Sequence, residues 1–477
     1  MNNNQPHKKF TLKYIIVLVV VAVMASGATV FIYELSGKSA PLASSGSSFE
    51  EVDQLYEMIE GGYIKKVDKE KLIDGALKGM TEAVGDPHTN YLSPEKAKDF
   101  DDSVSGNFEG IGAIMTLKDG YPTVAEPPIK GSPAEKAQLK TDDVIIKIDG
   151  KDVIKDKPLE DTVKLVRGKK GTSVKLEISR GKDTFTVNIK RDTIPVESVH
   201  SSIDKNNKSI GKIEITSFND TTSDEFNNAV TQLRKEGAKS FIVDLRGNPG
   251  GVLGEVEKII SRFLKDGETI VQFESLHEKR NADKARKELD KGDKIKEPTV
   301  LLVDEYSASA SEVMASALKD TGRFEVVGEK TFGKGTVQML LPLENGGELK
   351  LTVRKWLTPK GEWIHEKGVK PTVEVKYPDY FENLVIDTSL KYREGVISEH
   401  VKIINEYLKL LGYPIETVGD VYNAETVAAV KQFQSDQKLS ETGNADEETI
   451  QKLTTAVFDN WKENDQQYQK AVEILTK

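Results

Sequence analysis

The spacing of apolar positions divides the first half of the chain into two kinds of segment. Residues 49 to 95 carry apolar side chains at helical spacing, with a break at Gly61 and Gly62. From residue 106 to 191, short β-rich runs such as Val144–Ile148 alternate with turns. The pattern predicts N-terminal helices followed by a small β-rich module that carries one or two helices.

The second half opens with alternating strand-like and helix-like runs between residues 209 and 375. Phe241–Leu245 and Thr299–Val303 are mostly apolar runs of strand length, and amphipathic helical stretches follow them. Such alternation predicts an α/β layer with strands at its centre. Residues 274 to 297 are almost entirely polar, which is typical of a solvated helix or loop. A mobile flap beside the functional site is the second interpretation.

Beyond this layer the pattern is helical again. Residues 396 to 455 predict a compact three-helix unit, and residues 456 to 477 predict a terminal helix.

The N-terminal stretch departs from this soluble pattern. Tyr14–Tyr33 is uncharged, and at about 1.5 Å per residue a helix of this length crosses the ~30 Å hydrocarbon core. Lys8, Lys9 and Lys13 precede it, which favours a cytoplasmic N-terminus and an outward-facing body. A retained membrane anchor and a cleaved signal peptide both remain open. Either one exports the body, and Ser36–Ser48 then reads as a flexible linker.

Composition narrows the chemistry. The 477 residues carry a net charge of −10 without a basic stripe, which argues against a nucleic-acid partner. The chain has no cysteine, so disulfides, thiol catalysis and cysteine-ligated metals are excluded. The 6 histidines are scattered without metal-ligand spacing, and neither a metal nor another cofactor is expected.

Three polar turns follow apolar strands, where open α/β layers build their sites. Residues 246–251 are rich in glycine, which lets backbone N–H groups converge. Residues 306–311 are rich in serine and alanine and open a helix, whose first N–H groups are unpaired. In the third turn, four-residue spacing on an extended chain puts Lys334 and Gln338 on one face.

A nucleophilic serine needs a base, and no histidine has an obvious partner for a Ser-His-Asp triad. Lysine serves if its pKa falls by roughly three units, at a cost of about 4 kcal/mol. Lys334 lies between two glycines near apolar residues, so its burial is plausible. Serine–lysine spacings recur by chance in this lysine-rich chain, so the residues alone leave the pair Ser309 and Lys334 open.

Five short blocks of the sequence resemble those of one known family, and they occur in the same order as in that family. DLRGNPGG (Asp244–Gly251), YSASASE (Tyr306–Glu312) and TFGKGTVQ (Thr331–Gln338) resemble the signature blocks of the carboxy-terminal processing (tail-specific) protease family. GDPHTNYL (Gly85–Leu92) and GNFEGIG (Gly106–Gly112) resemble two further blocks. The resemblance spans about residues 50 to 380. It implies a crotonase-like α/β fold for the core. It also implies that the substrates are proteins with apolar C-terminal tails.

The same resemblance implies roles for individual residues. Ser309 would be the nucleophile, Lys334 the general base and Gln338 its positioning partner. The backbone N–H of Ala310 and of one glycine, Gly250 or Gly251, would form the oxyanion hole. Trp356 stands where the family usually has tyrosine, a change expected near the rim of the site.

The β-rich module resembles a PDZ domain, with Gly110, Ile111 and Gly112 as its carboxylate-binding loop. Consecutive N–H groups of such a loop hold a peptide terminus while the peptide pairs with the adjacent strand. A packing module without a ligand is the alternative. Arg167 is expected to couple this module to the protease core, or else to be an ordinary surface arginine.

The C-terminal unit resembles a peptidoglycan-binding-like domain, and wall binding competes there with a folding or dimer-contact role. The family resemblance also implies a homodimer, through the N- and C-terminal helices, and regulated processing of membrane or secreted proteins. The expected parts are an N-terminal anchor or signal (1–35), a linker (36–48), N-terminal helices (49–102), the PDZ domain (103–191), the protease core (192–385), the peptidoglycan-binding-like domain (396–455) and a final helix (456–477).

Three polar residues have simpler interpretations. His88 is expected to pin the N-terminal helices to the core, and Glu312 to be a first-turn charge that favours the helix dipole. Asp244 is expected to pair with Arg246 or Arg354. Two other classes of protein compete with the protease: a non-catalytic binding scaffold, and an enzyme of the signal-peptidase or penicillin-binding type, whose K-T-G and S-D-N companion motifs are missing.

Overall fold

The computed structural model describes residues 49–378, 380 and 386–477, and it divides into two compact units between Ala83 and Val84. No helix within these ranges is long and apolar enough to cross a membrane. The apolar stretch Tyr14–Tyr33 and the linker that follows it lie outside the described residues.

In the part that the structure describes, the first unit contains the helices α2 (Glu50–Gly62) and α3 (Lys69–Glu82). The break between them follows the glycine pair that the sequence pattern marks. Asp68 caps α3, because its carboxylate accepts hydrogen bonds from the backbone N–H groups of Glu70 and Lys71.

The β-rich module in the second unit is an antiparallel sheet with strand order β3-β4-β5-β7-β8. β3 lies at the edge of this sheet, and α6 contacts it. The module is flanked by a two-stranded pair, β2 with β9, where the chain enters and leaves. The elements are β2 (Asn107–Gly110), β3 (Met115–Lys118), β4 (Tyr121–Val124), α5 (Pro133–Lys136), β5 (Val144–Ile148), β6 (Lys151–Asp152), α6 (Leu159–Val166), β7 (Ser173–Arg180), β8 (Asp183–Lys190) and β9 (Asp192–Pro195).

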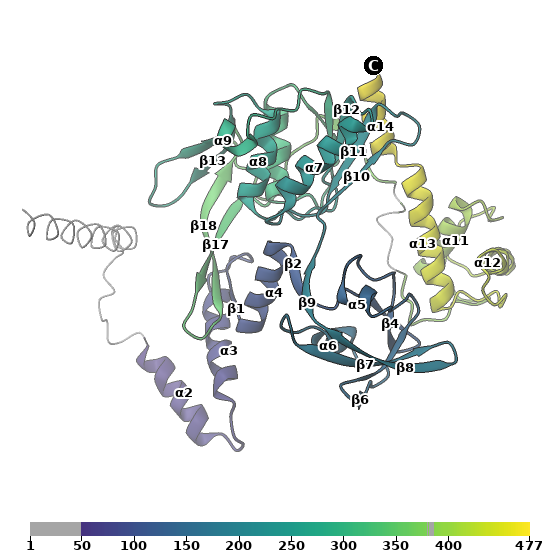
Figure 1. Ribbon diagram of the computed structural model, residues 1–477. Helices are drawn as coiled ribbons and strands as arrows, with labels where there is room; N and C mark the ends of the chain where they lie inside the picture. The colour runs from purple at the N-terminus through teal and green to yellow at the C-terminus, as the bar shows by residue number, and fades with distance from the viewer. Residues whose placement is uncertain (1–48, 379, 381–385) are drawn as a thin grey trace, which may run out of the picture. The chain divides into compact units, whose positions relative to one another are not determined.

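The largest core surrounds a sheet with strand order β10-β11-β12-β15-β16-β19, parallel except for the edge strand β10. The expected strands Phe241–Leu245 and Thr299–Val303 correspond to its central strands β12 and β15. β12 lies beside β11 and β10 in Figure 1. The elements are β10 (Val199–Ile203), β11 (Ile210–Ile215), α7 (Thr222–Lys235), β12 (Ser240–Asp244), α8 (Leu253–Phe263), β15 (Thr299–Val303), α10 (Ala310–Asp320), β16 (Glu325–Gly328) and β19 (Val373–Glu374).

Both faces of this sheet are covered at its central strands β12 and β15, where every residue is buried. Val243 and Leu301 point to the face that α7, α8 and α10 cover. Ile242 and Leu302, one position away along each strand, point to the opposite face, where Ala471 of α14 (Gln466–Thr476) packs. The last helix of the chain therefore completes the core of the α/β layer.

A second sheet lies beside this layer, with strand order β1-β18-β13-β14 and β17 paired to β18. The polar segment 274–297 contributes a strand to it and buries Asp290, which accepts hydrogen bonds from Ser261 and Lys294. Most of the segment is exposed, as expected, with Ala285, Asp290 and Ile295 buried. The elements are β1 (Asn90–Leu92), α4 (Pro94–Ser105), β13 (Thr269–Glu274), β14 (Asn281–Lys284), α9 (Lys287–Asp290), β17 (Thr336–Pro342) and β18 (Glu348–Leu357).

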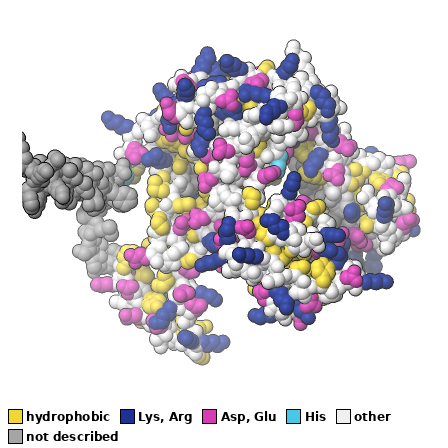
Figure 2. Space-filling model, in the orientation of Figure 1, with side chains coloured by type: hydrophobic (Ala, Val, Ile, Leu, Met, Phe, Trp, Pro, Cys, Tyr) yellow, Lys and Arg dark blue, Asp and Glu magenta, His cyan; other side chains and the backbone are white. Residues whose placement is uncertain are grey.

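Within the second unit, the C-terminal helical region has its own apolar core. It is formed by α11 (Glu399–Leu410), α12 (Ala424–Asp436) and the first turns of α13 (Glu447–Glu463). On the face shown in Figure 2, basic and acidic side chains are interspersed rather than separated. That face carries no extended basic stripe.

Candidate active site

Ser309 lies at the junction between the β15–α10 turn and the helix α10. Its backbone has φ 54° and ψ −113°, a left-handed conformation that is strained for a residue with a side chain. Strain of this kind persists only where the surroundings hold the backbone in place.

Asp304 holds the beginning of the Ser309 turn. Its carboxylate accepts hydrogen bonds from the backbone N–H groups of Tyr306 and Ser307 in the same turn. It also accepts two hydrogen bonds, of 2.9 and 3.0 Å, from the N–H of Gly247 in the glycine-rich turn. One buried carboxylate therefore joins the turn after β12 to the turn after β15.

The glycine-rich turn also packs directly against Ser309. The carbonyl oxygen of Asn248 accepts hydrogen bonds from the N–H of Ala308 and from the hydroxyl of Ser311. Gly250 has φ 101°, and a Cβ there would lie 2.8 Å from the Cβ of Ser309 and 2.9 Å from the N of Ala310. Only glycine allows the backbone to approach Ser309 so closely.

The two candidate oxyanion glycines differ in their hydrogen bonds. The N–H of Gly250 donates to the side-chain oxygen of Asn248 at 2.8 Å. The N–H of Gly251 donates to no acceptor among the residues that the structure describes. Ala310 is the first residue of α10, where backbone N–H groups lack a partner within the helix. The geometry thus favours Gly251 over Gly250 as the second donor.

Glu312 plays a larger part than the expected first-turn charge. Its side chain is 0% exposed. Its carboxylate accepts hydrogen bonds from the N–H of Ser309 (2.9 Å), the hydroxyl of Thr331 (2.6 Å), and the N–H groups of Gly333 (2.7 Å) and Lys334 (2.8 Å). Burial raises the pKa of Glu312, and these donors oppose the rise. A carboxylate three residues after the serine, among apolar helix positions, is the sequence signal for this role.

Lys334 is half-buried in the turn that precedes β17. Burial lowers the pKa of its amine, and the positive charge of Lys350 lowers it further, while Asp86 and Glu312 oppose the shift. The direction is the one that a general base requires. Trp356, which is 2% exposed, donates a hydrogen bond from its indole nitrogen to the carbonyl of Lys334 at 2.9 Å. Trp356 thus supports the Lys334 segment from within the core rather than from the rim.

Gln338 is held by threonines. Its side-chain nitrogen donates to the hydroxyls of Thr336 (3.0 Å) and Thr352 (3.1 Å). A register shift between Val337 and Gln338 interrupts the alternation of β17, so simple four-residue spacing does not fix which face Gln338 shares. Among the side chains described, no hydrogen bond joins Lys334 to Gln338 or to Ser309.

The block around His88 lies close to Lys334. Burial lowers the pKa of His88, and the charge of Lys334 lowers it further. The rings of His88 and His365 pack edge to face with centroids 6.5 Å apart. Thr89 links the block to β18, because its hydroxyl accepts a hydrogen bond from the N–H of Thr352. His88 is therefore a neighbour of the candidate base, a role that its sequence motif alone does not reveal.

Asp244 pairs with Arg246, one of its two expected partners, at 2.7 Å. Arg354 pairs instead with Glu278 at 3.0 Å. No group of histidine or acidic side chains in the described ranges is arranged to hold a metal ion.

The candidate tail-binding loop follows β2. Ile111 is buried, and Gly112 has φ 78° with the Cβ of Ser132 only 2.4 Å from where its own Cβ would lie. The edge of β3 begins a few residues later, beside α6. Arg167 follows α6, and its guanidinium lies 5.0 Å from the ring centroid of Phe108 in β2. Arg167 thus contacts the strand that leads into the loop.

Comparison with known proteins extends these observations. Family models match peptidase family S41 (residues 209–375), a PDZ domain (110–190), the activating protease CtpB N-terminal domain (19–96) and a putative peptidoglycan binding domain (398–453).

Two curated relatives match along nearly the whole chain. The carboxy-terminal processing protease CtpA of Bacillus subtilis is 44% identical over 475 residues, covering 98% of this chain and 99% of the relative. The carboxy-terminal processing protease CtpB of the same organism is 38% identical, covering 90% and 89%. A solved photosystem II D1 C-terminal processing protease is 27% identical and covers 69% of this chain and 87% of its own, with a TM-score of 0.40. The chain belongs to the carboxy-terminal processing proteases of peptidase family S41.

Proposed function

We propose that the protein is a serine endopeptidase in which Ser309 attacks the scissile carbonyl and Lys334 takes the serine proton. The observation that carries this proposal is the carboxylate of Glu312, which binds the backbone N–H of both Ser309 and Lys334. Through it, the segment that bears the nucleophile and the segment that bears the base share one anchor. The lowered pKa of Lys334 supports its role as the base.

The reaction proceeds through an acyl-enzyme. The Ser309 oxygen bonds to the substrate carbonyl carbon, and its proton passes to the neutral Lys334 amine. The N–H groups of Ala310 and Gly251 stabilise the oxyanion. The protonated amine then gives its proton to the leaving amine, and water, activated by the same amine, hydrolyses the ester. Gln338 orients Lys334 in the substrate-bound enzyme, which requires its amide to leave Thr336 or Thr352.

The PDZ domain selects substrates by their C-terminal tails. The loop formed by Gly110, Ile111 and Gly112 would bind the terminal carboxylate while the tail adds to the free edge of β3. The exposed side chain of Ile114, next to that edge, suits apolar tails. Arg167 reports tail binding to the core through Phe108.

The setting of this activity is extracytoplasmic. The uncharged stretch Tyr14–Tyr33 supports export, either as an anchor or as a cleaved signal. The C-terminal unit would bring the enzyme to peptidoglycan. The family resemblance supports a homodimer, a crotonase-like core, regulated proteolysis and the domain limits given above.

A peptide with an apolar C-terminal tail tests the proposal. The wild-type protein is expected to cleave it, and Ser309→Ala and Lys334→Gln are expected to bind the tail without cleavage. Mass spectrometry of the quenched reaction should find the acyl group on Ser309. Cleavage by Ser309→Ala at the wild-type rate would overturn the proposal. Tail binding without cleavage by any variant, wild type included, would leave a binding scaffold in its place.

A further inference from the structure

Arg246 joins the glycine-rich turn to the C-terminal end of the chain. It stands four residues before Gly250, and its side chain is 8% exposed. Its Nε and Nη2 donate to the two carboxylate oxygens of Asp244 at 2.9 and 2.7 Å. Its Nη1 donates at 3.0 Å to Asp465 and at 3.0 Å to Gln467, and its Nη2 lies 2.7 Å from the second oxygen of Asp465.

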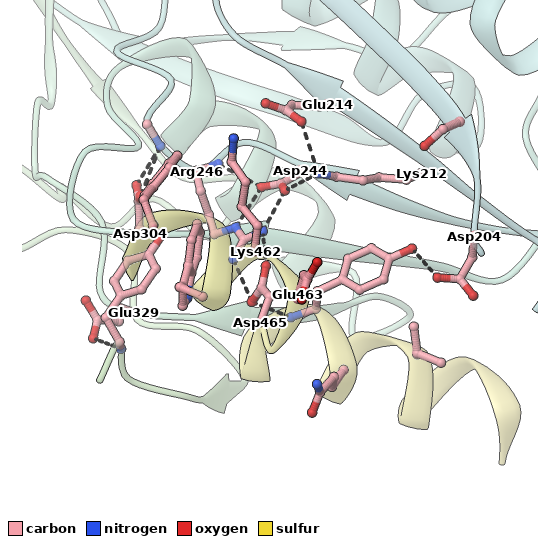
Figure 3. Close-up of a pocket in the computed structure, with 18 of the residues that line it drawn as sticks. Asp204, Lys212, Glu214, Asp244, Arg246, Asp304, Glu329, Lys462, Glu463 and Asp465 are labelled. Atoms are coloured by element: carbon pink, nitrogen blue, oxygen red, sulfur yellow. Dashed lines mark hydrogen bonds and ion pairs between the residues drawn. The ribbon is translucent and has the colours of Figure 1, made fainter. Parts of the chain in front are cut away.

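These contacts use every hydrogen-bonding direction of the guanidinium. A planar fork bound by two carboxylates and an amide has one orientation, which a lysine or a single partner would not impose. The ring of Trp461 lies 5.5 Å from the guanidinium carbon and closes a further side. Figure 3 shows Arg246 between Asp244, from the sheet, and Asp465, from the C-terminal helix.

Hydrogen bonds and the Trp461 ring hold the Arg246 side chain. It lies on the wall of a cavity of about 1160 Å³, lined largely by charged and polar side chains and bounded by the end of α13 and the beginning of α14. Among the hydrogen-bond partners of Arg246 described above, Asp244 belongs to the same strand-to-turn segment. The contacts that tie Arg246 to something outside the segment come from Trp461, Asp465 and Gln467.

The position of Arg246 bears on the proposed oxyanion hole. The turn from residue 246 to 251 is joined to the Ser309 turn through Asp304 and through the carbonyl of Asn248. Gly250 leaves no room for movement toward Ser309, since even a Cβ would clash. The opposite end of the turn is fixed by Arg246 and its partners from the C-terminal helix.

We infer that Asp465 is a positioning residue of the protease: through Arg246 it holds the glycine-rich turn so that the Gly251 N–H faces the reacting carbonyl. This inference rests on the proposed function of Ser309 and the oxyanion donors. Asp465 also caps α14, accepting a hydrogen bond from the N–H of Tyr468. The test must therefore separate the two roles.

Asp465→Ser makes this separation, because serine retains the cap and removes the contact with Arg246. In the full chain, we expect Asp465→Ser to lower kcat on the tail peptide by about tenfold or more, with KM within about twofold. Thermal unfolding should remain near that of the wild type. Asp465→Asn, which keeps the side-chain volume, should act in the same direction. The matched control is Glu463→Gln, an exposed carboxylate on the same cavity wall, which should leave kcat unchanged.

Arg246→Lys identifies the route. The double variant combines Arg246→Lys with Asp465→Ser. If Asp465 acts through Arg246, the kcat loss of the double variant will be no larger than that of Arg246→Lys alone. The pH of the acid limb of the rate profile should not move, since Lys334 is untouched. Wild-type kcat in Asp465→Ser and Asp465→Asn, or losses that multiply in the double variant, would overturn the inference. Failure of the proposed function is distinguishable, because Ser309→Ala would then retain cleavage in the same assay.

Discussion

The carboxylate of Glu312 lies 2.9 Å from the backbone nitrogen of Ser309 and 2.8 Å from that of Lys334. These residues come from different strand-to-turn segments of the core, one after β15 and one before β17. No cation pairs with Glu312 through a hydrogen bond in the described chain; its contacts are N–H groups and one hydroxyl. Its function is therefore to fix backbone geometry.

Replacing Glu312 tests this geometry. Glu312→Gln presents an amide group to N–H donors and leaves at least one buried donor unpaired, at about 1–3 kcal/mol each. We expect lower thermal stability and a loss in kcat on the order of 100-fold, because Ser309 and Lys334 shift relative to each other. Glu305→Gln, an exposed carboxylate in the preceding turn, is the control. Equal kcat values for the two variants would contradict the role assigned to Glu312.

Gly250 is expected to tolerate no side chain. In Gly250→Ala the added Cβ would lie 2.7 Å from the carbonyl oxygen of Ala308 and 2.8 Å from the Cβ of Ser309, in a backbone with φ 101°. The predicted outcome is a kcat reduced on the order of 100-fold. Gly254→Ala meets nothing within 4 Å in the nearby helix α8 and should gain up to about 1 kcal/mol in stability. Steady-state kinetics with thermal unfolding compares the pair.

Lys350 is expected to help keep Lys334 neutral. Its charge lowers the pKa of Lys334, so Lys350→Met should raise that pKa. Activity requires the neutral amine and rises as pH rises through the Lys334 pKa, so the acid limb of kcat/KM should move to higher pH. A change of about 1 kcal/mol moves it by about 0.7 units. The control is Lys330→Gln, which replaces an exposed lysine in the turn that carries Lys334 and should leave the acid limb in place. An acid limb that Lys350→Met does not move would rule out the effect of Lys350.

The tail-binding loop offers a matched pair of glycines. Gly112 and Gly131 have φ 78° and 79°, but a Cβ on Gly112 meets Ser132 at 2.4 Å whereas one on Gly131 meets nothing within 4 Å. Both alanine variants bear the left-handed backbone penalty of about 1–2 kcal/mol. Only Gly112→Ala should weaken binding of a tail peptide to Ser309→Ala protein, measured by calorimetry. Equal weakening in both would argue against carboxylate binding at this loop.

The sequence pattern predicts the elements more readily than their partners. β12 and β15 each centre on an apolar run, and the helix after Ser309 follows from local spacing, so these elements could be predicted. The pairing of β1 with β18 joins Asn90 to Lys350, and no local pattern encodes such distant contacts. The packing of α14 on the sheet is similarly remote. Its amphipathic pattern predicts a helix but does not reveal which surface it covers.

The candidate site divides in the same way. Ser309, Lys334 and the glycine turn are marked by blocks of adjacent residues, which a sequence displays directly. The environment of Lys334 depends on Asp86, His88 and Lys350, which reach it only through tertiary structure. The register shift between Val337 and Gln338 likewise interrupts the alternation on which the predicted shared face depends.

The central claim is that Lys334 is a neutral amine at the pH of catalysis. NMR titration of the lysine side-chain signals in the full-length Ser309→Ala protein, with Lys334→Gln to assign the resonance, measures this directly. We expect a Lys334 midpoint below the ordinary lysine value of 10.5. A midpoint at or above that value, in the presence of a bound tail peptide, would contradict it.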